Sequence, residues 1–257
     1  MTRVATDEKG GQTFEEGDEI SVYAWTGDAT VAPETRERVV NNAINKLTNG
    51  SWISNPQMLW KNNRDKHYFI GVYPISAISD LSAGEYTFDE TKQVESDLLV
   101  AVNKDGLSYN VDEQQPVPLT FTHVMAKLVV NLTYKNQWGG IPTVEKVVVG
   151  NAAKEATINY LTKVVTPSTT AKEDFSLPEI TENTKYVSVI IPQEEVTQLT
   201  IVIGGKNFVY DNGTPFKLES GKITTVNLEV GRDEIKLGDV KITNWEDGST
   251  FSGEALN

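Results

Sequence analysis

The part of the chain that follows residue 118 is dominated by short segments rich in Val, Ile and Thr. Gly, Pro, Asn or Asp residues bound these segments, which read LTFTHVMAKLVVNLTY, VEKVVVGN, ATINY, KYVSVIIP, TQLTIVIGG, KNFVY and GKITTVNLEV. β-Branched side chains fit the pleated, half-buried surface of a sheet, and turn residues at this spacing are typical of a β-sandwich. This half of the chain is therefore predicted to be all-β.

The first hundred residues carry similar strand signals, in the segments EISVYAWT, QMLWKN, KHYFIGVYP and DLLVAVNK. In the first of these segments, Ile20 and Val22 alternate with Tyr23 and Trp25, so both faces of the strand are rather apolar. Strict alternation with period two is the pattern of a β-strand. We expect a second strand-dominated module here.

One helix is predicted in this first module, near residues 34–48. Pro33 suits the first helical turn, and the apolar residues that follow recur at helical spacing: Val40, Ala43, Ile44 and Leu47. Arg36 and Arg38 would then lie on the exposed side as solvated charges. The segment DEQQPVP at 112–118 is polar and holds two prolines, which disfavour a continuing central strand. It divides the chain into predicted domains at 1–115 and 116–257.

The composition argues against two classes of partner. The formal charge of −13 and the absence of a basic cluster disfavour a nucleic acid and an anionic membrane surface. No segment approaches the roughly 18 apolar residues of a spanning helix. The opening residues MTRVATDEKGGQ lack the apolar centre of a signal peptide. Two locations therefore stay open: the cytoplasm, or export with the signal already removed.

The sequence offers little for catalysis, cofactor binding or metal binding. The chain has no cysteine and only two histidines, His67 and His123, and neither accompanies a GxSxG nucleophile motif. Phosphate-binding glycine motifs are absent as well, and the five tryptophans are scattered along the chain. His67 opens an apolar strand. We predict a protein that is not an enzyme, with no catalytic, cofactor-binding or metal-binding residues.

The segment around His123 shows an unusual change of pattern. Apolar side chains occupy the odd positions up to His123, and the even positions from Ala126 to Leu132. Because side chains alternate along a strand, such a change requires a bulge, a bend or a break. We predict a corner at residues 123–125, with the imidazole hydrogen-bonded at the edge of a core. A copper site is the alternative, but one His and one Met make an incomplete ligand set.

This segment also resembles a known signature. The pattern F-x-H-x-M-A-K-L is formed by Phe121, His123, Met125, Ala126, Lys127 and Leu128. It is similar to the strand that enters the C-terminal domain in the fimbrillin-like family, the subunits and accessory proteins of type V pili. The segments TRVAT, GDEISV, YFIGVYP, SDLLVA and VKITNWEDG resemble other parts of that family in the same order, the last through Trp245.

The resemblance implies two transthyretin-like β-sandwich domains, the first with the short inserted helix. It also implies export as a lipoprotein precursor, with a lipid-anchored Cys upstream of Thr2, and a place in the fimbrium or at the outer membrane of an anaerobic Gram-negative bacterium. Partners would be other fimbrial subunits, joined by β-strand exchange after a trypsin-like protease cuts behind an arginine. Here the candidate cut lies between Arg3 and Val4. The sequence does not identify a receptor.

The tail EDGSTFSGEALN is short and polar for a donated strand. A tip or accessory subunit is therefore at least as well supported as a stalk subunit. The alternative function is a surface glycan-binding lipoprotein of a polysaccharide-uptake system, which predicts two or three Trp or Tyr side chains on one exposed face. An enzyme such as a glycosidase would need a cleft with two carboxylates and is the least favoured class.

Overall fold

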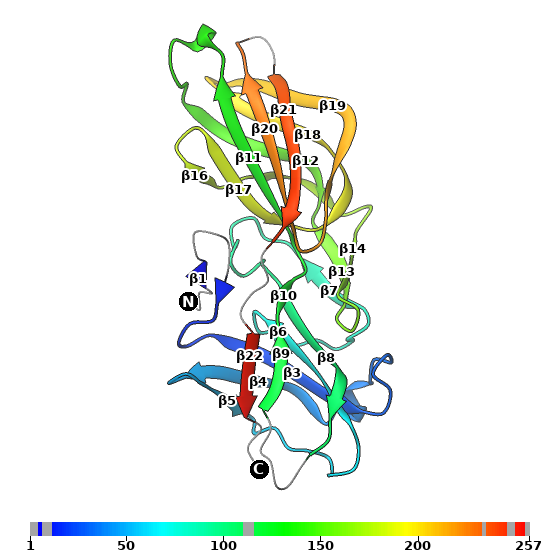
Figure 1. Cartoon of the computed structure of the whole chain (residues 1–257). Helices are drawn as coiled ribbons and strands as arrows, with labels where there is room; N and C mark the ends of the chain where they lie inside the picture. The colour runs from blue at the N-terminus through cyan, green and yellow to red at the C-terminus, as the bar shows by residue number, and fades with distance from the viewer. Residues whose placement is uncertain (1–4, 7–11, 110–115, 233–234, 246–249, 255–257) are drawn as a thin grey trace.

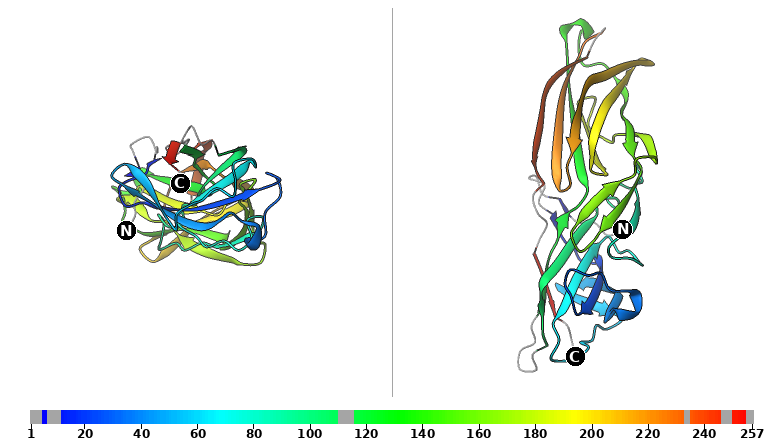
Figure 2. Two further views of the ribbon diagram at one scale, coloured as in Figure 1. Left: turned by 90° about the horizontal axis from the view of Figure 1, so that it is seen from below. Right: turned by 90° about the vertical axis from the view of Figure 1, so that its right-hand side faces the viewer.

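The computed structural model describes residues 5–6, 12–109, 116–232, 235–245 and 250–254. Its regular elements are β-strands apart from two 3-10 turns of three residues each, so the all-β prediction is confirmed. Two units lie end to end and make an elongated molecule (Figures 1 and 2). In the described part of the chain no helix is long and apolar enough to span a membrane.

The first unit is built on a six-stranded antiparallel sheet. Its strands, in spatial order, are β10 (Thr122–His123), β8 (Leu99–Leu107), β6 (His67–Tyr73), β3 (Glu19–Thr26), β4 (Val40–Thr48) and β5 (Ser51–Asn55). Both faces of β3 are buried. Ile20 and Val22 pack on one face, whereas Tyr23 and Trp25 belong to a larger cluster on the other face that continues into the second unit. This explains why the second face of this segment is apolar in sequence.

A two-stranded ribbon covers the first of these faces. β9 (Pro116–Thr120) pairs antiparallel with β22 (Thr250–Glu254), which lies beside it in the lower unit of Figure 1. Val117 and Leu119 of β9 are buried in the same cluster as Ile20, whereas the three residues that alternate with them are exposed. Strand β22 thus returns to the first unit.

A further short pair, β1 (Ala5–Thr6) and β2 (Gln12–Thr13), lies near the N-terminus.

The predicted helix at 34–48 is wrong. Residues Thr35–Glu37 form a single 3-10 turn, and β4 begins at Val40. Ala24 and Val22 of β3 pair with Val40 and Ala43, so β4 holds one extra residue, at a site where Asn42 has a φ of 57°. Such a bulge places two residues three positions apart on the same face. The bulge therefore gave the buried residues of β4 the same spacing in the sequence as the apolar face of a helix.

The second unit is a sandwich of two sheets. One holds β16 (Glu179–Thr181), β17 (Lys185–Ile190), β11 (Ala126–Tyr134), β20 (Lys222–Val230) and β21 (Ile235–Asn244), and the other holds β15 (Lys172–Ser176), β12 (Val144–Ala153), β18 (Gln193–Ile203) and β19 (Lys206–Leu218). Strands β11 and β20 run parallel, and the other pairs are antiparallel. Ala126, Leu128, Val130 and Leu132 point into the core, as their alternation predicts.

A small third sheet joins the two units. β7 (Gly84–Thr87) lies between β6 and β8 in sequence and pairs with β13 (Glu155–Asn159), which also pairs with β14 (Val164–Pro167). The larger hydrophobic cluster contains residues from both units. The predicted domain division between residues 115 and 116 stays a prediction. Strands β9 and β10, which follow it, lie with the first unit, and the chain passes to the second unit at Val124–Met125.

Candidate functional site

The signature segment is the point at which the chain crosses between the units. Thr122 and His123 pair with β8 of the first sheet, and the N–H of Val124 donates to the carbonyl of Leu98 at 3.0 Å. Ala126 then begins β11 of the second unit. The change of pattern in the sequence therefore corresponds to the junction at which β10 ends and β11 begins.

His123 lies buried in this junction. Its Nδ1 lies 2.8 Å from Oδ1 of Asp97, and its ring stacks on the indole of Trp245 with centroids 3.7 Å apart and planes 7° apart. Its Nε2 is buried without a hydrogen-bond partner. Among the described residues no group of three or more His, Asp or Glu side chains could hold a metal ion. The geometry at His123 is that of a packed ring held by one carboxylate.

Lys127 completes the contact around Trp245. Its Nζ lies 5.0 Å from the centroid of the indole ring, within reach of a cation–π interaction. Burial lowers the pKa of the Lys127 ammonium, and the carboxylate of Asp97 acts in the opposite direction. The backbone N–H of Trp245 donates to the carbonyl of Gly221 at 3.1 Å, which fixes the end of β21. Hence two residues of one segment, His123 and Lys127, meet Trp245 from the far end of the second unit.

The remaining signature residues are core residues. Phe121 is fully buried in the first unit, where its ring lies 5.2 Å from that of Phe14 in an edge-to-face contact. Met125, Ala126 and Leu128 are fully buried in the larger cluster. The structural role predicted for these residues stays a proposal.

A loop of the first unit makes a second tie between the units. The side-chain carbonyl Oε1 of Gln93 accepts a hydrogen bond from the N–H of Val189 in β17 at 2.7 Å and one from the hydroxyl of Ser188 at 3.3 Å. The Nε2 of Gln93 donates to the carbonyl of Glu90 in its own loop. Neither Gln93 nor Asp97 was found from the sequence, because each acts through residues far away in the chain.

The candidate cleavage site, Arg3 and Val4, lies outside the described residues. Of the other N-terminal arginines, Arg36 is exposed as predicted. Arg38 is 8% exposed and donates to the carbonyls of Ile78 and Ser79, so the prediction of a solvated charge was wrong for it. Its guanidinium also lies over the ring of Tyr23.

The C-terminal strand β22 pairs with a strand of the first unit. Five residue pairs join β22 to β9, from Thr250 opposite Thr120 to Glu254 opposite Pro116. The strand is separated from β21 by residues 245–249 and reaches the unit at the other end of the molecule (Figure 1). A terminal strand in this position can be supplied by its own chain or by another copy.

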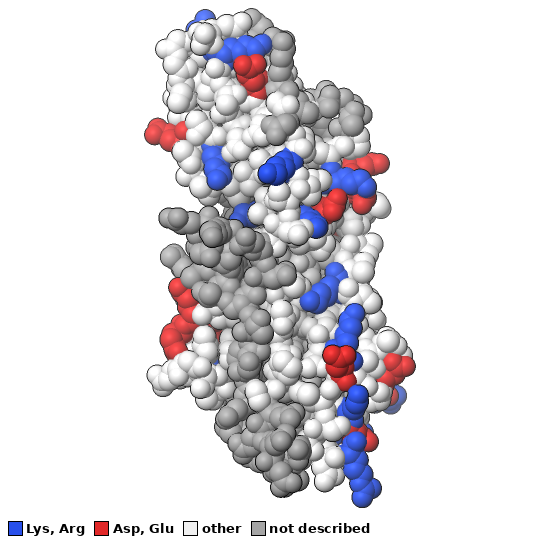
Figure 3. All heavy atoms as spheres, in the orientation of Figure 1, with Lys and Arg blue, Asp and Glu red and all other residues white. Residues whose placement is uncertain are grey.

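The tryptophans do not form a common exposed face. Trp25, Trp52 and Trp245 are buried, and the two half-buried ones, Trp60 and Trp138, belong to different units. On the face shown in Figure 3, basic and acidic side chains are interspersed. A large field of one sign, which a nucleic acid would need, is not visible on that face.

Comparisons with known proteins agree with this architecture. The sequence profile of the family described as fimbrillin-like matches residues 2–245, so β22 follows the end of the matched region. No curated protein matches the sequence.

Solved structures share the fold at low identity. A candidate cell adhesion protein from Bacteroides uniformis has a TM-score of 0.70 at 19% identity, over 93% of this chain and 95% of its own. A candidate cell adhesion protein from Bacteroides ovatus has a TM-score of 0.69 at 17% identity, over 91% and 89%. The tip fimbrial protein Mfa3 from Porphyromonas gingivalis, with a C-terminal truncation, has a TM-score of 0.55 at 11% identity, over 94% and 97%.

Proposed function

The chain belongs to the fimbrillin-like family, and from that premise we propose that it is a non-catalytic fimbrial subunit that assembles with other subunits by β-strand exchange. Membership implies a location at the cell surface and assembly with fimbrial partners. Export as a lipoprotein precursor, anchoring at the outer membrane and a transthyretin-like classification of the two units are finer parts of the same proposal.

The observation that carries the proposal is the pairing of β22 with β9. A strand that pairs with its own unit through main-chain hydrogen bonds can make the same bonds with an identical unit of a neighbour. Such an exchange costs little, because each bond lost within the chain is replaced by one between chains. In the monomer, β22 pairs with β9 of its own chain. In the assembled fimbrium, β22 would pair with β9 of a neighbouring subunit.

The length of β22 favours a tip or accessory position. Only five residues of the tail pair with β9. Every joint inside a stalk would depend on this short strand, whereas a terminal subunit takes part in one joint only. Removal of the residues before Val4 by a trypsin-like protease is the proposed trigger, as the family resemblance suggests.

The proposal is tested by trimming the purified chain with trypsin and following its size by SDS gel electrophoresis without boiling. We expect SDS-resistant oligomers from the trimmed chain. A variant that ends at Trp245 should give none by itself, because it lacks β22. If the shortened variant forms the same oligomers as the full chain, exchange of β22 is excluded.

A further inference from the structure

Strand β9 carries prolines at two of its five positions, Pro116 and Pro118. Proline has no N–H to donate to a ladder and is confined to the edges of sheets. The two prolines alternate with Val117 and Leu119, so the main-chain groups of both prolines point to the same edge of the strand. Their positions decide at which edge β9 can accept another strand.

The edge of β9 that faces β22 has its donors intact. In an antiparallel ladder, residue pairs that exchange two hydrogen bonds alternate with pairs that exchange none. A pair that includes Pro116 or Pro118 cannot exchange two hydrogen bonds, because the proline lacks the donor. The residues of β9 that bond to β22 are therefore Val117 and Leu119.

The opposite edge of β9 faces β8 and lacks these donors. The side-chain Nδ2 of Asn103 in β8 donates to the carbonyl of Pro118 at 3.5 Å, which places this carbonyl on the side of β8. Thr122 of β10 pairs with Val100 of β8, and the same register continued would place Pro118 opposite Lys104. In the described ladders, however, β8 pairs with β6 and β10, and β9 pairs with β22. The ladder with β8 thus ends where the prolines begin.

Side chains hold β9 on the first unit in place of a ladder with β8. Val117 is 5% exposed and Leu119 is 2% exposed, and both belong to the cluster of Ile20. A Cβ added at Gly71 of β6 would lie 3.1 Å from Cδ1 of Leu119, so this side chain packs directly on the sheet. The main-chain bonds of β9 thus depend on the strand that lies at its other edge.

Strand β5 limits the space on the far side of β22. Figure 1 shows β22 between β9 and β5, and Cα atoms of β22 and β5 approach within 8 Å of each other. A further strand between them would need about 10 Å, which is twice the spacing of neighbouring strands in a sheet. Strand β22 therefore fills a slot one strand wide between β9 and β5, which we call the strand slot.

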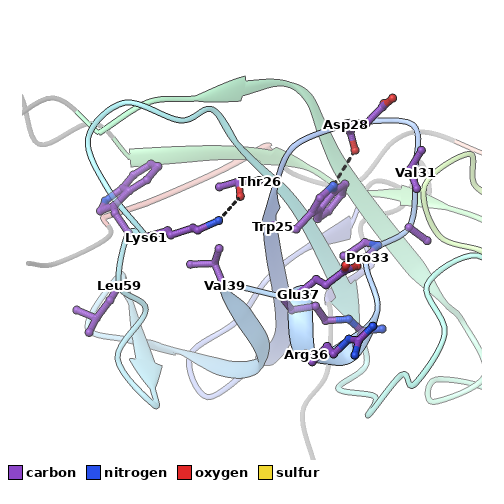
Figure 4. Close-up of a pocket in the computed structure, with 13 residues that line it drawn as sticks. Trp25, Thr26, Asp28, Val31, Pro33, Arg36, Glu37, Val39, Leu59 and Lys61 are labelled. Carbon is purple, nitrogen blue, oxygen red and sulfur yellow. Dashed lines mark hydrogen bonds between the residues drawn. The ribbon is translucent and has the colours of Figure 1, made fainter.

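A hollow beside Trp25 and Trp60 is separate from the accepting edge of β9. It has a volume of about 720 Å³ and lies between residues 27–39 and residues 59–61 (Figure 4). None of residues 116–120 lines it. A ligand bound in this hollow would therefore not compete for β9 with a strand.

We infer that the first unit holds one strand at a time, so that β22 of its own chain and the same strand of a second copy exclude each other. Pro116 and Pro118 are positioning residues in this arrangement: they leave β9 a single bonding edge, and an incoming strand has no second edge to join. Strand β22 is then a built-in inhibitor of assembly that a neighbour's strand must displace. The inference rests on the proposed function, because it takes β9 as the accepting strand, and it goes further by fixing how many strands are bound.

The test uses the full chain with Thr120→Cys and Thr250→Cys, at positions that lie opposite each other in the β9–β22 pair. This chain is oxidised, trimmed with trypsin, and divided into an oxidised half and a reduced half. The probe is a labelled synthetic peptide of residues 246–257, EDGSTFSGEALN, which has no Lys or Arg for trypsin to cut, and its binding is followed by fluorescence anisotropy.

The reduced chain should bind one peptide per chain, because the peptide can displace β22. The oxidised chain should bind the peptide at least about a hundredfold more weakly, because the disulfide holds β22 in the strand slot. The parent chain, treated with the same oxidant and trypsin, is the matched control and should bind the peptide as the reduced chain does. Equal binding by the oxidised and reduced chains would overturn the inference by revealing a second accepting edge, and so would two peptides per reduced chain.

If neither half binds the peptide, the proposed exchange fails, and hydrogen exchange in Pro118→Val then decides whether the prolines close one edge of β9. This substitution restores an N–H on the edge that faces β8. The new amide should exchange at least about fivefold more slowly than an exposed amide, because it can bond to β8. The amides of Val117 and Leu119 are internal references and should stay protected as in the parent. Free exchange of the new amide would show that the prolines do not close this edge, and it would overturn the inference.

Discussion

His123 and Trp245 stack face to face, with ring centroids 3.7 Å apart, although the strands of the second unit's sandwich all lie between them in sequence. The contact brings the entry and the exit of the second unit together at the junction. Asp97 of the first unit holds the other side of the imidazole. The ring of His123 therefore contacts one side chain from each of the two units.

Replacing Trp245 by Ala should destabilise the protein by about 3–5 kcal/mol, the usual cost of removing a buried aromatic side chain. The measurement is urea unfolding followed by circular dichroism. Trp245→Phe is the matched control and should lose much less, because the indole Nε1 has no hydrogen-bond partner to lose. A loss below about 1 kcal/mol in Trp245→Ala would show that the stack does not hold the junction.

Gln93 supplies a hydrogen-bond acceptor between the units. Gln93→Ala leaves the N–H of Val189 without this partner and should cost about 1–3 kcal/mol. The local effect is measurable as faster hydrogen exchange at the Val189 amide. Gln93→Glu keeps an oxygen in reach and should preserve most of the protection. Unchanged exchange in the Ala variant would contradict a role for Gln93 in joining the units.

The burial of His67 should make the stability of the protein depend on pH. Burial lowers the pKa of its imidazole below the ordinary value of 6.5, with the carbonyl of Asp65 opposing this effect. Below that pH the unfolded chain binds more protons than the folded one, so this group lowers stability as the pH falls from about 7 to about 5. His67→Gln removes the titrating group. As the pH falls from about 7 to about 5, the unfolding free energy of the variant should therefore decrease less than that of the parent. A difference that stays constant with pH would contradict the prediction.

Gly71 allows Phe121 to approach β6. A Cβ at this position would lie 2.6 Å from Cζ of Phe121 and 3.1 Å from Cδ1 of Leu119. Gly71→Ala should therefore destabilise the first unit by about 1–3 kcal/mol through overpacking. Adding Phe121→Leu should cost less in the Gly71→Ala background than in the parent, since the smaller side chain relieves the clash. Additive losses measured by urea unfolding would argue against direct contact.

The sequence predicted local features better than distant pairings. The alternation from Ala126 to Leu132 and the break before it correspond to a real strand and a real corner. The segment 40–48 failed because the bulge at Asn42 gave Val40 and Ala43 the spacing of a helix. A bulge adds one residue to a strand, and nothing in the local composition marks its position.

Features made by residues far apart in the chain were not predictable. The pairing of β22 with β9 depends on main-chain bonds across most of the second half of the sequence, and the tail itself reads as polar. The hollow near Trp60 joins two loops, and Arg38 was taken for a surface charge because its burial depends on the carbonyls of Ile78 and Ser79. In each case the feature is formed by residues far apart in the chain, so no local sequence pattern indicates it.

Exchange of the C-terminal strand is tested most directly by cysteine crosslinking, for which this cysteine-free chain is well suited. Thr120 and Thr250 lie opposite each other in the β9–β22 pair, and directly opposed residues of antiparallel strands are close enough for a disulfide. A chain that carries only Thr120→Cys is mixed with a chain that carries only Thr250→Cys, trimmed with trypsin and oxidised. The account predicts disulfide-linked pairs of the two chains on a non-reducing gel, and an internally linked monomer when both substitutions are in one untrimmed chain. If the double variant links internally and the trimmed mixture yields no linked pairs, β22 stays with its own unit and the proposed mode of assembly is wrong.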